Sequence, residues 1–85
     1  MPKIQAKSAA ERLPGLGAAI REVRQKNGYG LELVAAAVGV HLSALSKIER
    51  GERLPTLPVV VAIAAEFGVT VDSLVARAAE ITSRD

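Results

Sequence analysis

The chain has 85 residues, of which 49% are hydrophobic and 24% are charged, and it contains no cysteine. This composition is typical of one small globular domain, and the lack of cysteine excludes disulfides and thiolate metal sites. A single histidine, His41, supplies too few ligands for a histidine-based zinc site. We therefore expect neither a metal ion nor another cofactor.

The net charge is +2, but the charged residues are unevenly distributed. Residues 16–55 contain six basic and four acidic side chains, whereas residues 56–85 contain two basic and four acidic ones. A basic front and an acidic back suit an anionic partner on one side of the molecule. The longest apolar run, Leu57 to Ala65, contains Pro58 and is too short to span a bilayer. Because the first residues also lack a signal-peptide pattern, we expect a soluble cytoplasmic protein with no membrane partner.

The N-terminal segment, residues 1–14, shows no clear periodicity and is predicted to be a flexible basic arm. Its basic residues are Lys3, Lys7 and Arg12. From Leu16 onward, apolar residues at positions 16, 20 and 23 form the stripe of an amphipathic helix. This first helix is predicted to end near Asn27 and Gly28.

Glycines mark the ends of the next two helices. A helix from Leu31 to Val38 is followed by Gly39, and a helix from about Leu42 to Arg50 is followed by Gly51. Glycine is the residue best suited to the left-handed conformation that terminates a helix.

Threonines mark the starts of the last two helices. Thr56 is predicted to cap a helix that ends at Phe67, and Thr70 one that runs to about Ala79. Five short helices without a strand signal predict an all-α, compact domain over residues 15–80, followed by a C-terminal tail, residues 81–85.

The pair of helices within residues 31–50 has the pattern of a helix-turn-helix. Ala35 stands where the two helices would touch and Gly39 stands at the turn. The apolar seam between them would consist of Val34, Val38, Val40, Leu45 and Ile48. By itself this pattern fits an ordinary helical hairpin equally well.

The flanking residues distinguish these two interpretations. The run Ala19 to Gly28 precedes the pair, and the run from Leu45 to Leu57 closes it with the segment Lys-Ile-Glu-Arg-Gly and a later Pro-Thr. With these flanks, residues 16–75 resemble the Cro/repressor-type (XRE) helix-turn-helix family of prokaryotic and phage DNA-binding proteins. The resemblance implies a compact five-helix repressor-like fold, in agreement with the helices expected from caps and glycines.

The resemblance also implies that the third helix enters the major groove of DNA with its exposed early positions against base edges. Lys47 can donate to guanine, serine hydroxyls can bond to several bases, and Leu42 or Ala44 can pack on a thymine methyl group. The candidate base-reading residues are Leu42, Ser43, Ala44, Ser46 and Lys47.

Other charged residues receive positioning roles from the same resemblance. Arg50, Arg53 and protonated His41 are candidates for phosphate contacts, which fix the register on DNA without reading its sequence. Arg24 and Glu49 match the family positions that form a buried ion pair between the first and third helices.

The chain departs from the family pattern at several positions. Leu31 stands where the family usually has a phosphate-bonding glutamine, and His41 is a poor N-cap in place of the usual hydroxyl residue. Leu33, Leu42 and Ala44 make the expected DNA face unusually apolar. An alternative function is therefore a protein–protein interaction module or antitoxin that uses this apolar face on a protein partner, such as a toxin or another regulator.

The sequence gives no support for catalysis. His41 and Ser43 lack a third residue to orient them, and neither a phosphate-binding glycine loop nor a carboxylate cluster is present. We expect a transcriptional regulator that binds double-stranded DNA sequence-specifically, and we expect it to act as a repressor. Because one recognition helix reads only a few base pairs, it should bind a pseudo-palindromic operator as a dimer.

The fourth helix supplies the candidate dimer interface. Val60, Ile63, Ala64 and Phe67 provide one face that is sufficient for packing against the rest of the domain. A helix that is apolar on every side is expected to be buried on every side. The interface residues left by this argument are Val59, Val61, Ala62 and Ala65, with a contribution from the fifth helix.

Overall fold

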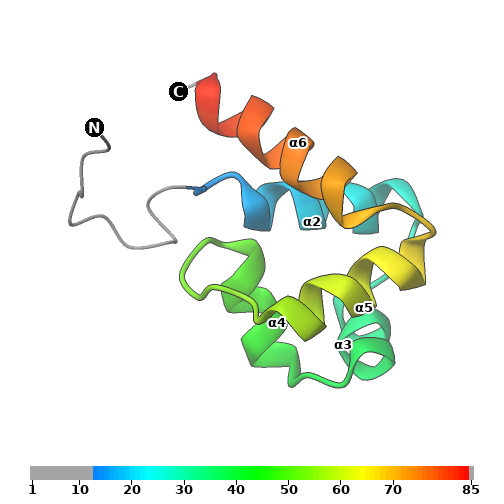
Figure 1. Ribbon diagram of the computed structural model, residues 1–85. Coiled ribbons are helices and arrows are strands. Elements are labelled where there is room, and N and C mark those ends of the chain that lie inside the picture. Colours follow the sequence, from blue (N-terminus) through cyan, green and yellow to red (C-terminus); the bar gives the residue numbers. More distant parts are fainter. Residues whose placement is uncertain (1–12, 85) are drawn as a thin grey trace.

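The computed structural model describes residues 13–84, which form five helices and no strand. The helices are α2 (Leu16–Lys26), α3 (Leu31–Val38), α4 (Leu42–Glu49), α5 (Leu57–Phe67) and α6 (Val71–Ser83). Helices α2 and α6 lie along one side of the molecule, α4 lies below α2, and α3 lies on the opposite side of α5 from α6 (Figure 1). The all-α, five-helix prediction is confirmed.

The helix ends follow from local residues. Gly39 and Gly68 adopt left-handed conformations with φ of 76° and 66°, which end α3 and α5 at little steric cost. The hydroxyl of Thr56 accepts a bond from the Val59 amide at 3.4 Å, and that of Thr70 accepts from the Ser73 amide at 3.0 Å. His41 precedes α4 without any side-chain capping bond.

All five helices contribute to a single hydrophobic core. Its fully buried members include Ile20, Leu45, Ile63 and Leu74, and Ala35 of α3 is also buried. Helices α3 and α4 are bent by 109° relative to each other across a short turn. Residues 31–50 therefore form the helix-turn-helix that their pattern predicts.

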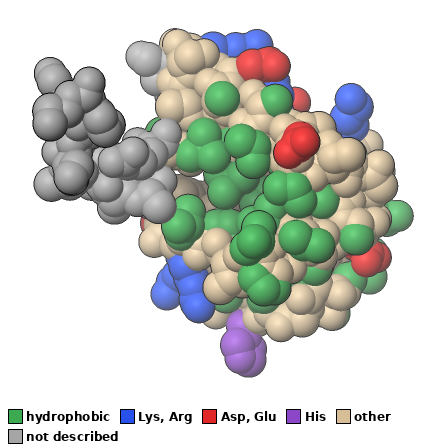
Figure 2. Space-filling view, viewed as in Figure 1, with side chains coloured by type: hydrophobic (Ala, Val, Ile, Leu, Met, Phe, Trp, Pro, Cys, Tyr) green, Lys and Arg blue, Asp and Glu red, His purple; other side chains and the backbone are tan. Residues whose placement is uncertain are grey.

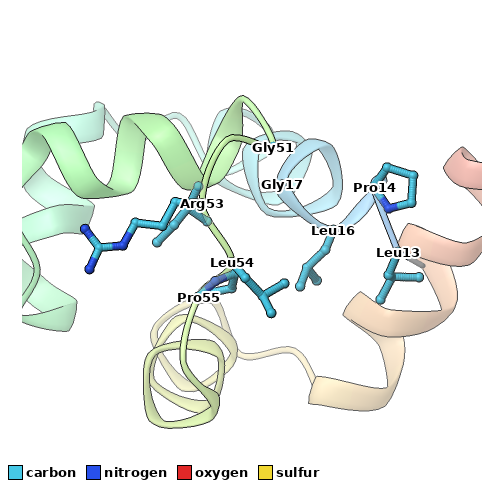
Figure 3. Close-up of a pocket in the computed structure, with 9 residues that line it drawn as sticks. Leu13, Pro14, Leu16, Gly17, Gly51, Arg53, Leu54 and Pro55 are labelled. Atoms are coloured by element: carbon cyan, nitrogen blue, oxygen red, sulfur yellow. The ribbon is translucent and has the colours of Figure 1, made fainter. Parts of the chain in front are cut away.

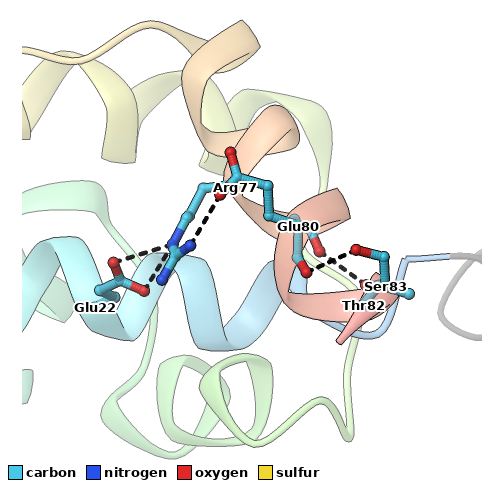
Figure 4. Close-up of polar contacts among 6 residues, drawn as sticks. Glu22, Arg77, Glu80, Thr82 and Ser83 are labelled. Atoms are coloured by element: carbon cyan, nitrogen blue, oxygen red, sulfur yellow. Dashed lines mark hydrogen bonds and ion pairs between the residues drawn. The ribbon is translucent and has the colours of Figure 1, made fainter. Parts of the chain in front are cut away.

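Polar contacts fasten α6 to α2 near the middle of α6 and at its C-terminal end. Arg77 donates to Glu22 at 3.1 Å and to Glu80 at 3.0 Å (Figure 4). The Gly15 amide donates to the hydroxyl of Thr82 at 3.0 Å. These contacts order the C-terminal residues through the tertiary structure.

This packing moves the expected boundaries of the domain. Helix α6 continues to Ser83, and Ile81 packs against the core, so the tail expected at residues 81–85 begins inside the helix. Leu13, assigned to the arm, also packs against the core. Lys3, Lys7 and Arg12 of the arm lie outside the described residues.

Residues 13–84 contain no single helix long and apolar enough to cross a bilayer. Two consecutive pairs, α3 with α4 and α5 with α6, pass that test by length and composition only when joined across sharp bends. No group of three His, Cys, Asp or Glu side chains in the same range is placed to hold a metal ion. A cavity of about 20 Å³ lies between Leu16 and the loop at Leu54 (Figure 3), room for about one water molecule.

Candidate nucleic-acid interface

Helix α4 divides into an inner and an outer face. Leu45 and Ile48 are buried in the core, whereas Leu42, Ser43 and Lys47 are exposed. The remaining two base-reading candidates, Ala44 and Ser46, are half-buried. The outer face therefore presents a cation, a hydroxyl group and an apolar side chain, which are groups suited to base edges in a major groove.

The C-terminal end of α4 is held by an ion pair with α2. Arg24 Nε lies 2.7 Å from Glu49 Oε2, and Nη2 donates to Oε1 at 3.0 Å. The side chains are only 12% and 5% exposed. The hydrogen bond from Arg24 to Glu49 raises the pKa of the arginine, which favours its charged form. The pair that the resemblance implies is thus present in the structure.

Arg24 also ties the loop before α3 to this pair. Its Nη1 donates to the carbonyl oxygen of Tyr29 at 2.8 Å. The Tyr29 ring stacks on Phe67 at the end of α5, with ring centroids 5.9 Å apart. One guanidinium group therefore joins α2, α4 and the start of the helix-turn-helix.

A close backbone contact fixes the same end of α4. A Cβ atom added to Gly17 on α2 would lie 2.1 Å from the Ile48 carbonyl oxygen and 2.8 Å from that of Glu49. Only glycine at position 17 lets α2 approach α4 this closely. The periodicity of α2 does not predict that Gly17 contacts the backbone of Ile48, because that contact joins two separate helices.

The phosphate-contact candidates are all exposed. Arg50 follows α4 and forms an exposed ion pair with Glu52, with Nε 2.7 Å from Oε2. Arg53 extends its guanidinium away from the small cavity lined by its own loop (Figure 3). His41 is exposed at the N-terminal end of α4. These residues are therefore available to an external partner.

An open groove of about 220 Å³ lies beside α4 and contains a cation that sequence reasoning missed. Its lining residues are Arg21, Arg24, Leu31, Ser46, Glu49 and Arg50. Arg21 lies three residues before Arg24, and helix positions three apart are neighbours. This spacing was the available sign that Arg21 would share a surface with the Arg24–Glu49 pair.

The candidate dimer residues do not share one environment. Val61 is 49% exposed and Ala65 is exposed, but Ala62 is half-buried and Val59 packs against the core. The prediction that Val59 lies outside the core packing is therefore wrong. Leu57, which was not among the candidate dimer residues, is 68% exposed.

Three exposed apolar residues of α5 form one stripe. Leu57, Val61 and Ala65 are spaced four residues apart and therefore share one helix face, here named the α5 apolar face. Hydrophobic side chains gather over α5 in the space-filling view (Figure 2). Such a concentration is a common feature of association surfaces.

Comparison with known proteins agrees with this architecture. The chain is 38% identical over 58 residues to the uncharacterized HTH-type transcriptional regulator YazB of Bacillus subtilis, covering 68% of this chain and 84% of that protein. It is 36% identical over 55 residues to the HTH-type transcriptional regulator DdrOP3 of Deinococcus deserti, covering 65% of this chain but only 43% of that protein.

A solved structure shows the same arrangement of helices. The clp gene regulator ClgR from Corynebacterium glutamicum superposes with a TM-score of 0.79 at 29% identity, covering 81% of this chain and 73% of that one. The family model described as Helix-turn-helix matches residues 20–74, the segment that contains the Arg24–Glu49 pair and both helices α3 and α4. The chain therefore belongs to the helix-turn-helix family of transcriptional regulators.

Proposed function

We propose that this protein is a sequence-specific transcriptional regulator that binds double-stranded DNA through α4 and acts as a repressor. The single observation that carries the proposal is the fixed orientation of α4. Its C-terminal end is held by the buried Arg24–Glu49 pair while Ser43 and Lys47 project outward. A rigidly held helix with polar outer positions fits recognition in a major groove.

The proposed roles separate into base reading and positioning. Leu42, Ser43 and Lys47 contact base edges, with Ser46 and Ala44 at the margin because they are half-buried. Arg50, Arg53 and His41 contact phosphates, which supply affinity without sequence information. The names of the regulator relatives favour DNA over the protein–protein alternative, which rested on Leu31 in place of the family's usual glutamine and on the apolar Leu42.

The test is selection of bound sites from a pool of random duplexes. We expect enrichment of a pseudo-palindrome, because two recognition helices related by a two-fold axis read two half-sites. The matched control is Lys47→Ala, which should enrich a site degenerate at the position that Lys47 reads. A pool that stays random with the wild-type protein would contradict sequence-specific binding.

We further propose that the functional unit is a homodimer formed through the α5 apolar face. Leu57 and Val61 are large and exposed there, whereas the recognition positions lie on a different helix. A two-fold axis through α5 leaves both α4 helices free to meet DNA. A small domain also gains stability by burying such a face.

Sedimentation at micromolar concentration tests the dimer. Val61→Glu places a charge on the α5 apolar face and should convert dimers to monomers, since burying an unpaired charge is costly. Leu33→Glu makes the same kind of change at a residue that is 59% exposed on α3, and it should leave the dimer intact. A monomeric wild type, or a dimeric Val61→Glu variant, would overturn this interface.

A further inference from the structure

The groove between α2 and α4 combines a size and a chemistry suited to an anion. It has a volume of about 220 Å³, is open to solvent, and is lined by three arginines, one glutamate, one serine and one leucine. Ser46 and Arg50 belong to α4 or follow it directly. The groove is therefore continuous with the face that α4 would present to DNA.

The charges in the groove do not cancel. Glu49 is bound by Arg24 through two hydrogen bonds of 2.7 and 3.0 Å, so its carboxylate is neutralised locally. None of the ion pairs among residues 13–84 involves Arg21. Two cations, Arg21 and Arg50, are left to face the groove.

Arg50 retains donors despite its own partner. Its contact with Glu52 runs through Nε, and both side chains are 55% exposed. A guanidinium has five N–H donors, and an exposed ion pair of this kind is weak. The terminal nitrogens of Arg50 can therefore bind an anion without first breaking a strong interaction.

We propose that Arg21 and Arg50 together bind one backbone phosphate of double-stranded DNA in the groove between α2 and α4. Arginine suits this ligand because its planar fork matches the geometry of phosphate oxygens. Leu31, at the start of α3, lines the groove with an apolar side chain that has no hydrogen-bond donor. The cationic donors for the phosphate are therefore Arg21 of α2 and Arg50 at the end of α4. The inference rests on the proposed DNA-binding function and adds Arg21 to it.

Binding to random duplex at several salt concentrations gives the first test. Each lost phosphate contact reduces the slope of log affinity against log salt by about one unit. We expect Arg21→Ala to lower the slope by about one unit for each protomer bound. The matched control is Arg84→Ala, which removes the same charge from the end of α6, on the far side of the molecule from α3 (Figure 1).

Phosphate ethylation interference on the selected site then localises the contact. In the wild-type pattern, one phosphate in each half-site should be sensitive to ethylation, and it should become less sensitive in Arg21→Ala, in which Arg50 alone still contacts it. All other phosphates that are sensitive to ethylation with the wild-type protein should stay sensitive with Arg21→Ala. An unchanged salt slope, a slope change equal to that of Arg84→Ala, or an unaltered interference pattern would overturn the proposal while leaving DNA binding by the wild type intact. Failure of the wild type to bind any duplex would instead overturn the proposed function.

Discussion

The two ends of α4 differ in almost every physical respect. At the C-terminal end, Glu49 is nearly buried against Arg24, and the backbone of Ile48 touches Gly17. At the N-terminal end, His41 makes no capping bond, and Leu42 and Ser43 are exposed. The position of the C-terminal end is fixed by contacts with α2, whereas the N-terminal end has no side-chain cap.

This difference separates positioning from recognition within eight residues. A reading helix must be held rigidly if its side chains are to meet base edges with reproducible geometry. Its recognition positions must remain exposed, and they then contribute little to stability. Substitutions at the C-terminal end should therefore reduce folding stability, while those on the outer positions should change DNA binding.

The largest expected effect is the loss of the buried ion pair. Arg24→Ala leaves the Glu49 carboxylate buried without its cation and also frees the Tyr29 carbonyl. The free energy of unfolding should fall by about 4 kcal/mol, measured by chemical denaturation. Arg77→Ala breaks the more exposed pair that joins Arg77 of α6 to Glu22 of α2 and should cause a much smaller loss. Equal losses for the two variants would contradict the special role of the α4 end.

The second effect tests the close contact between helices. Gly17→Ala places a Cβ atom 2.1 Å from the Ile48 carbonyl oxygen, so α2 and α4 must separate. We expect the free energy of unfolding to fall by about 3 kcal/mol, despite the better helix propensity of alanine. Gly30→Ala is the control, because its Cβ would meet no atom within 4 Å. A stabilised Gly17→Ala protein would show that this contact does not hold α4.

The third effect concerns an outer position. Lys47→Ala should weaken binding to the selected site by about 2 kcal/mol and binding to random duplex far less, as expected for a base contact. Lys26→Ala removes an exposed cation from α2 and serves as the charge control. Fluorescence anisotropy with both duplexes measures the difference. Equal losses on both duplexes would reassign Lys47 to a phosphate.

The smallest expected effect comes from adding a side-chain cap at the N-terminal end of α4. His41 has the extended backbone of an N-cap, with φ of −68° and ψ of 146°, but no capping bond. His41→Ser should therefore raise the free energy of unfolding by about 1 kcal/mol. Thr70→Ala removes an existing cap on α6 and should lower it by a similar amount in the same assay. No gain in His41→Ser would mean that the start of α4 is already stabilised by other contacts.

The sequence by itself determined the helices and their order. Gly39 and Gly68 end helices because a left-handed residue is needed there, and Thr56 and Thr70 begin them because their hydroxyls accept bonds three residues ahead. Such signals act within one turn of the chain, so they can be read without knowing the fold. Ala35 with Gly39 likewise marked the helix-turn-helix.

Only the tertiary structure decided which residues meet across the domain. The sequence showed that α5 is apolar on nearly every side, but packing turned Val59 toward the core and left Leu57 exposed. It extended α6 to Ser83 through contacts with α2, and it brought Arg21 into one groove with Arg50. Local periodicity cannot predict these outcomes, because each depends on how separate helices approach one another, and that approach is set by close packing of side chains from all five.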